Sequence, residues 1–233
     1  MRDALEKFYR FVEEPIRLGS RPILVLLVLP LILAFTAPLW NISMKAPQYP
    51  QGLSLDIYAH KVEGGNAGND IQEINTLNHY IGMAPLNRAA LADLDWIPFA
   101  LGVLFILTLR VAAVGNVRAL IDLSVMTLYF SLFSLARFVY KLYTLGHDLD
   151  PKAPMTIEPF MPAVFGTKQI ANFTVTSMPR AASVYMAIFA LGVAALTIWH
   201  LVVGRIESRR AAASADPSST LAGRDETARR APR

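Results

Sequence analysis

The residues best suited to chemistry lie in the polar segment 69–86. His79 and Met83 are four positions apart there and would share one face of a helix that extended through both. An imidazole and a thioether together favour copper over magnesium or calcium, which prefer oxygen ligands. The segment therefore predicts a copper site, although His79 could instead hydrogen-bond within a packed loop and Met83 could belong to a core.

The same segment has the pattern of a short amphipathic helix. Its apolar residues recur every three or four positions, at Ile71, Ile74, Leu77 and Ile81. Asp70 is placed to cap the N-terminus, with Glu73 at the spacing of a capping box. Gly82 can end the helix, and Pro85 prevents its continuation. We expect this helix to lie at a membrane surface.

Further candidate ligands lie elsewhere in polar segments, namely His147, His60 and Met44. His147 precedes Asp148 and Asp150, and the three resemble a cluster of hard ligands, although the aspartates could instead cap turns before Pro151. Polar and aromatic side chains near both clusters are candidates for partner docking: Asn75, Asn78, Tyr80, Asp148 and Asp150.

The composition indicates a membrane protein, because 54% of residues are hydrophobic and the mean hydropathy is +0.38. Apolar segments long enough to cross a bilayer lie at about 22–40, 96–114, 119–140 and 181–203. The absence of cysteine excludes disulfides and thiolate metal sites. Basic residues are not interleaved with aromatic ones, so we expect no nucleic-acid partner.

We predict an all-α membrane protein with four transmembrane helices and both termini inside. Its parts would be a cytoplasmic amphipathic arm at 1–21, a four-span membrane domain at 22–203 and a disordered cytoplasmic tail at 204–233. Two long outer loops, 41–95 and 144–180, would form an extracytoplasmic cap with one short surface helix and a small β-ribbon.

The distribution of basic residues predicts the orientation. The arm, the short connection after the second span and the tail hold 14 Lys and Arg, against 8 for the long loops and the end of the third span. The more basic side is expected to be cytoplasmic. Both long loops would then face the periplasm of a bacterial inner membrane, together with His60, His79 and His147.

Charged and small residues within the spans predict contacts between helices. Asp122 is placed to pair with Arg118, one helical turn earlier, or with Arg110. The fourth span is rich in alanine and glycine, which allow close helix packing in lipid. The spans lack a central charged pathway of the kind that transporters use.

Several loop phrases occur together in a recognisable order. They are Ala46–Leu53 (APQYPQGL), Asp70–Ile71, Ile74–Met83 (INTLNHYIGM), Gly146–Pro151 (GHDLDP), Gly166–Gln169 (GTKQ) and Asn172–Thr174 (NFT). Over about residues 22–203 the chain resembles an uncharacterised family of four-span bacterial membrane proteins, often encoded beside nitrous oxide reductase and its copper-maturation genes. The resemblance implies a role in assembling, supplying copper to or feeding electrons to a periplasmic copper enzyme, with that enzyme or a copper chaperone as partner.

Three functions are compatible with these patterns. The first is a copper-accessory membrane protein whose outer loops bind copper or dock a partner. The second is a metal-free scaffold or docking subunit of a membrane complex, and the third is a redox subunit. Only His200 lies within a span, so we do not expect a bis-histidine haem inside this chain. No nucleophile constellation, phosphate loop or HExxH pattern is present, so we do not expect an enzyme.

Overall fold

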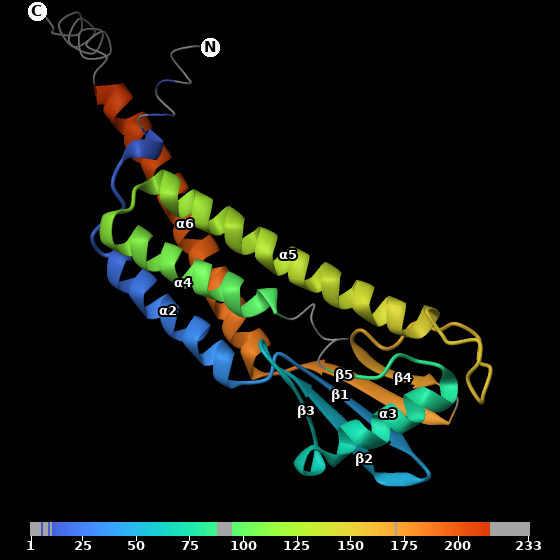
Figure 1. Cartoon of the computed structure of the whole chain (residues 1–233). Helices are drawn as coiled ribbons and strands as arrows, with labels where there is room; N and C mark the ends of the chain where they lie inside the picture. Colours follow the sequence, from blue (N-terminus) through green and yellow to red (C-terminus); the bar gives the residue numbers. More distant parts are fainter. Residues whose placement is uncertain (1–5, 7–8, 10, 88–94, 171, 215–233) are drawn as a thin grey trace, which may run out of the picture.

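The computed structural model describes residues 6, 9, 11–87, 95–170 and 172–214, and joins a bundle of helices to a β-sheet (Figure 1). The bundle comprises α2 (Ser20–Thr36), α4 (Trp96–Val114), α5 (Val117–His147) and α6 (Ala181–Ser214). Three of these helices are long and apolar enough to cross a membrane: α4, α5 and the Ala181–Gly204 part of α6. By length and composition, these three helices are candidate membrane spans, consistent with a multi-pass membrane protein.

The prediction of four transmembrane helices is wrong, because the first apolar segment does not remain helical to Trp40. Ala37 is extended, at φ −114° and ψ 156°, as expected for a residue that precedes a proline. Helix α2 ends at Thr36, and its 17 residues are about 26 Å long, so the helix alone is shorter than a hydrocarbon core of about 30 Å and a crossing here also needs the non-helical residues 37–39. Trp40 begins a strand instead.

The all-α prediction is also wrong, since residues of both predicted loops form one five-stranded antiparallel sheet. Its strands, in the order β3-β2-β1-β5-β4, are Val62–Gly64, Tyr49–Ile57, Trp40–Ala46, Phe173–Pro179 and Gly166–Ile170. Strand β1 pairs with β2 on one side and with β5 on the other, where Trp40 lies opposite Pro179. The sheet thus unites segments that are distant in the sequence.

Helix α3 (Asn69–Ile81) covers one face of this sheet (Figure 1). It follows a short 3-10 turn, η1 (Asn66–Gly68), and buries Ile74 against Leu53 and Leu55 of β2. Alternation along β2 places these two leucines on the same face of the strand. The predicted apolar stripe of the helix therefore packs on the sheet, and the cap has an α/β core of its own.

The helical bundle packs through a continuous apolar core. Leu24 and Leu31 of α2 are almost fully buried, together with Leu104 of α4 and Phe189 of α6. A Cβ atom added to Gly192 of α6 would lie 2.5 Å from the side chain of Leu27, so glycine permits the close approach of α2 and α6. The predicted close packing of the small-residue helix is thereby realised.

Residues 38–40 hold the cap firmly against the bundle. The amide of Leu39 donates to the carbonyl of Ile57, and the amide of Arg180 donates to the carbonyl of Leu39. The Ser183 hydroxyl donates to the same Leu39 carbonyl at 2.6 Å. The indole of Trp40 packs 5.0 Å from the ring of Phe138 on α5. Sheet and helices are consequently joined by hydrogen bonds and by ring packing.

The N-terminal segment docks at the end of the bundle opposite the sheet. The amide of Ile16 donates to Gly115 in the α4–α5 turn, and the amide of Val117 donates to Glu14. Ile16 is buried there, and Arg17 forms an ion pair with Glu207 of α6. Leu5 and Phe8 of the predicted amphipathic arm and residues 215–233 of the predicted tail lie outside the described residues, whereas residues 204–214 continue α6.

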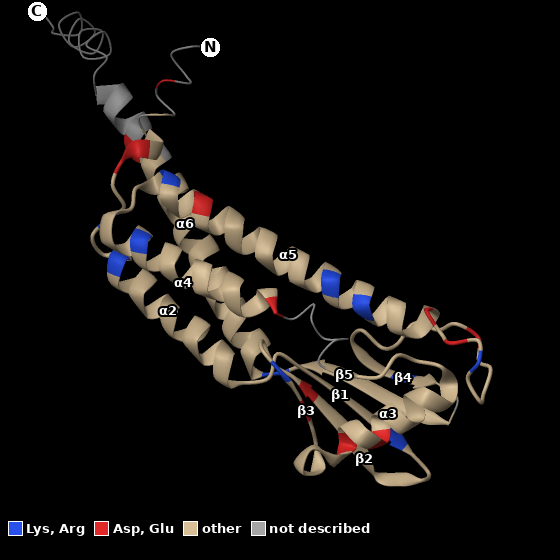
Figure 2. Ribbon diagram, viewed as in Figure 1, with Lys and Arg blue, Asp and Glu red and all other residues tan. Residues whose placement is uncertain are grey.

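Charged side chains are concentrated toward the two ends of the helices (Figure 2). Arg21, Arg110 and Arg118 lie near the α4–α5 turn, and Arg137 and Lys141 lie on the part of α5 nearer the sheet. Between Asp122 and Arg137, α5 carries no charge over about 22 Å. This uncharged interval suits a bilayer interior.

Candidate functional site

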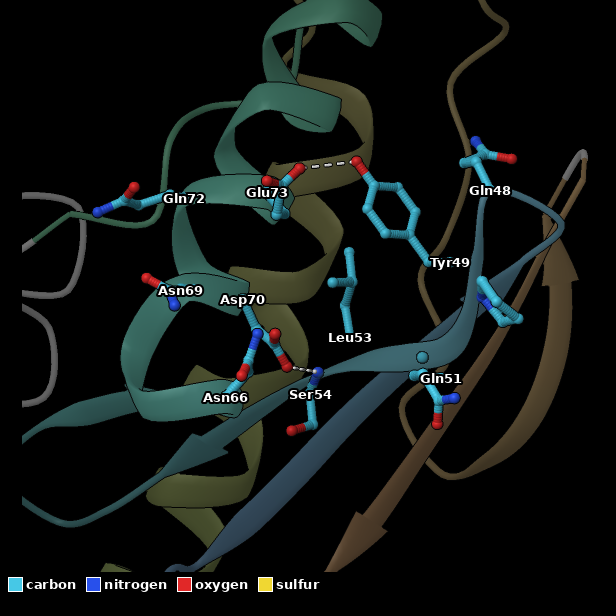
Figure 3. Close-up of a pocket in the computed structure, with 12 residues that line it drawn as sticks. Gln48, Tyr49, Gln51, Leu53, Ser54, Asn66, Asn69, Asp70, Gln72 and Glu73 are labelled. Carbon is cyan, nitrogen blue, oxygen red and sulfur yellow. Dashed lines mark hydrogen bonds between the residues drawn. The ribbon is translucent and has the colours of Figure 1, made fainter.

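The first two turns of α3 are fastened to strand β2 by two carboxylates (Figure 3). Oδ2 of Asp70 accepts a hydrogen bond of 2.8 Å from the backbone amide of Ser54. Oε2 of Glu73 accepts one of 2.7 Å from the hydroxyl of Tyr49. Asp70 was predicted to cap α3, but the N-cap residue is Gly68 and no side chain caps it. The two residues that have capping-box spacing, Asp70 and Glu73, therefore join α3 to β2.

A polar cavity of about 770 Å³ opens beside these two links. It is lined by residues of β2, the preceding turn, η1 and α3: Gln48, Tyr49, Pro50, Gln51, Gly52, Leu53, Ser54, Asn66, Asn69, Asp70, Gln72 and Glu73. Figure 3 shows Leu53 between the helix and the strand, with Tyr49 and Glu73 joined above it. We refer to this cavity as the amide groove.

The lining of the amide groove suits binding rather than bond-breaking chemistry. Side-chain amides both donate and accept hydrogen bonds, and the described lining residues add two carboxylates but no Lys, Arg or His. Its hydrogen-bonding groups match neutral polar or cationic surfaces, such as peptide backbone, amides or lysines, better than anions.

The Tyr49–Glu73 link has a clear electrostatic consequence. The hydrogen bond to the Glu73 carboxylate, together with desolvation and the charge of Glu73, raises the pKa of Tyr49 above its ordinary value of 10.0. The phenol therefore remains protonated, and remains a donor, throughout the neutral and moderately alkaline range.

The predicted pair His79 and Met83 lies at the C-terminal end of α3, where the helix stops before Met83. Gly82 is left-handed, at φ +76°, and the amide of Met83 donates to the carbonyl of Asn78 at 2.8 Å. These features form a Schellman motif, which turns the chain away from the helix axis. Gly82 ends α3 as predicted, so His79 and Met83 do not share a helical face.

The other candidate ligands have separate surroundings. His60 stacks on Phe35 at the end of α2, with ring centroids 6.4 Å apart. His147 ends α5 and stacks on Tyr143 at 3.9 Å, and Met44 packs into the small core between the sheet and α3. Within the described ranges, no three His, Asp or Glu residues form a group that could hold a metal ion. The copper-ligand assignment stays a prediction.

The predicted docking residues divide into structural and exposed groups. The Asn75 side chain bonds to the backbone of Leu86, accepting from its amide at 2.7 Å, and the buried Asn78 donates to Ala84. Both asparagines thus fold residues 84–86 back along α3. Tyr80 keeps 49% of its surface exposed, next to the exposed Met155, whose amide donates to the Tyr80 carbonyl.

Asp148 and Asp150 shape the loop that follows α5. The amide of Asp148 closes the last turn of α5, and a carboxylate oxygen of Asp150 accepts from the amide of Lys152 at 2.9 Å. The amide of Asp150 donates to Gly82, which ties this loop to the end of α3. The alternative interpretation of these aspartates as turn-forming residues matches this geometry.

Sequence reasoning missed the amide groove, although it singled out Asp70 and Glu73. Their spacing on the helix was visible, but Tyr49 and Ser54 become their partners only through the packing of α3 on β2. No protein-family model matches the chain, and no curated protein is significantly similar to it. The fold thus combines three candidate membrane spans with a cap of sheet and helix that carries a polar groove.

Proposed function

We propose that this protein is an accessory subunit of the bacterial inner membrane that docks a periplasmic copper enzyme, or a factor that matures it, against the membrane. The amide groove carries the proposal, since it is a 770 Å³ polar cavity on a cap that is hydrogen-bonded to the helical bundle. A rigid cap can hold a bound partner at a fixed position relative to the bilayer.

The client and the orientation come from the sequence. The ordered loop phrases resemble the family encoded with nitrous oxide reductase, which makes that enzyme the expected client. The excess of Lys and Arg in the N-terminal arm, the α4–α5 turn and the C-terminal tail favours a cytoplasmic position for these parts. The cap would then face the periplasm, where the client is located.

The docking function is tested by photo-cross-linking in native membranes. A photoreactive amino acid at Gln51, inside the amide groove, is compared with one at Lys152, which is exposed on the loop after α5. We expect nitrous oxide reductase or one of its maturation proteins to be cross-linked at Gln51 and not at Lys152. Equal capture at both positions, or capture of neither protein, would contradict docking through the groove.

Copper handling is the second candidate, and one observation favours it. The imidazole of His79 is exposed and makes no hydrogen bond within the described part of the chain, so it is available to a metal. Copper would be measured by elemental analysis of the purified, reduced protein after exposure to Cu(I). Copper retained by the wild type and lost in His79→Ala/Met83→Ala would support this function, and copper absent from both would leave docking without a metal.

A further inference from the structure

Helix α5 presents a row of exposed residues that lipid alone would not satisfy. The row alternates steps of four and three residues, through Arg118, Asp122, Val125, Tyr129, Leu132 and Ala136. Only 17% of the apolar window of α5 is buried, against 28% for α4 and for α6. Of the three candidate spans, α5 is therefore the one with most surface left to cover.

Two polar features make lipid an unsuitable cover for this row. Tyr129 is 73% exposed, about 18 Å along α5 from Val117, and its hydroxyl has no hydrogen-bond partner in the described part of the protein. Asp122 is exposed in the second turn, and its short side chain cannot extend to the headgroups as a lysine would. Unpaired polar groups in the bilayer are costly, so such residues usually face other protein.

The charges at the start of the row also lack their expected partners. Arg118 and Asp122 are one turn apart and could pair within the helix, yet neither side chain has an ion-pair partner among the described residues. Asp122 does not pair with Arg110 either, so the pairing predicted from the sequence is not formed. One positive and one negative group are thus available on the same face.

We propose that the exposed row of α5 binds the α5 helix of a second copy of this chain. Two identical chains insert in the same orientation, so their α5 helices would run parallel around a two-fold axis. A basic and an acidic residue one turn apart are then self-complementary. Arg118 of each copy lies beside Asp122 of the other, which gives two reciprocal ion pairs to side chains that have no ion-pair partner among the described residues of one copy.

The remainder of the row fits the same arrangement. Steps of four and three residues produce the seam of a parallel helix pair that crosses at about 20°. Val125 and Leu132 supply apolar layers on either side of Tyr129. At the centre, the two Tyr129 hydroxyls meet, and one can donate to the other, which gives each a partner that lipid does not offer. This inference goes beyond the docking function and does not depend on it.

Cysteine cross-linking tests the interface, because the chain has no cysteine of its own. Val125→Cys is placed in full-length protein, and Ile106→Cys on α4 is its control. Ile106 is 64% exposed. It lies as many residues before the end of α4 as Val125 lies after the start of α5, so the two cysteines are at the same distance from the α4–α5 turn and at the same depth in the membrane. After mild oxidation in native membranes, we expect disulfide-linked dimers for Val125→Cys and none for Ile106→Cys.

Charge reversal tests the reciprocal pairs. In the Val125→Cys background, Asp122→Arg brings four positive charges together, at positions 118 and 122 of each copy. The yield of disulfide-linked dimer, divided by the amount of inserted protein, should fall about tenfold. Arg118→Asp/Asp122→Arg exchanges the charges, restores both pairs and should recover the yield. Equal cross-linking at positions 125 and 106, no dimer at 125, a disulfide to a different protein, or no recovery in the exchanged variant would each overturn the proposal.

Discussion

At the scale of single residues, the cap depends on carboxylates that reach from a helix to a strand. Asp70 is only 6% exposed, and it supplies the acceptor for the Ser54 amide, which would otherwise lose its partner inside the cap. Glu73 makes the corresponding link one turn later, to the hydroxyl of Tyr49. Each bond fixes the position of α3 on β2, and hence the shape of the amide groove.

Removal of the first link should loosen the cap. We expect Asp70→Ala to destabilise the α3–β2 contact by about 1–3 kcal/mol, because it leaves the partly buried Ser54 amide unsatisfied. Hydrogen–deuterium exchange of peptides from β2 and α3 should become faster, with little change in α4. Gln72→Ala, an exposed neighbour on the same helix, is the matched control, and equal acceleration in both variants would contradict the role of Asp70.

The second link predicts a dependence on alkaline pH. The pKa of Tyr49 is raised above 10.0 in the folded protein by its bond to Glu73. Its contribution to stability is therefore complete below pH 10 and is lost as the pH rises through the folded pKa. The difference in ultraviolet titration between wild type and Tyr49→Phe should show a phenol that ionises above pH 10. Glu73→Gln should lower that pKa, and an unchanged titration would exclude the link.

At the scale of elements, local patterns predicted helices well and strands poorly. The apolar stripe of α3 and the left-handed Gly82 that ends it were both visible in the sequence, and α4 occupies the residues of the predicted second span. Strands β1 and β5 depend on each other across most of the chain, so no local window reveals them. Trp40 continued an apolar run and was assigned to a helix, although it pairs with Pro179 in the sheet.

The same limit applies to the candidate site. His147, His60 and Met44 were chosen by residue type, which carries no information about distance. His79 and Met83 were chosen by a spacing that brings them together only if the helix continues past Gly82, where α3 has already ended. The structure brings the loop after α5 to the end of α3, where Asp150 bonds to Gly82, but places His60 beside Phe35 and Met44 within a core. Of the groove residues, only Asp70 and Glu73 were singled out from the sequence, and the cavity they share with β2 arises only when α3 folds onto that strand.

Close packing of α2 and α6 supplies a prediction at the scale of elements. Gly192→Leu should destabilise the bundle by about 1–3 kcal/mol, because the larger side chain would overlap Leu27. The control is Gly102→Leu on α4, where an added Cβ meets no atom within 4 Å. The midpoint of thermal loss of helical circular dichroism in detergent should fall for the first variant and remain near wild type for the second. Equal midpoints would contradict this contact.

At the scale of the whole molecule, the two ends of the helical bundle carry different structures. One end gathers the N-terminal segment, the α4–α5 turn and the last turns of α6, held by the Arg17–Glu207 pair and by the backbone bonds of Ile16 and Val117. The other end is the α/β cap with the amide groove (Figure 1). A docking function in the periplasm requires that a bilayer lie between these two ends and that the cap be outside.

This orientation can be measured with single cysteines, since no natural cysteine interferes. Gln51→Cys places a thiol in the amide groove, and Glu13→Cys places one on the exposed side of the N-terminal segment. A membrane-impermeant maleimide added to intact spheroplasts should modify Gln51→Cys readily and Glu13→Cys only after the membrane is permeabilised. The opposite result would put the groove in the cytoplasm, where a periplasmic enzyme cannot reach it. It would rule out periplasmic docking while leaving the fold and the α5 interface untouched, because neither depends on which side the cap faces.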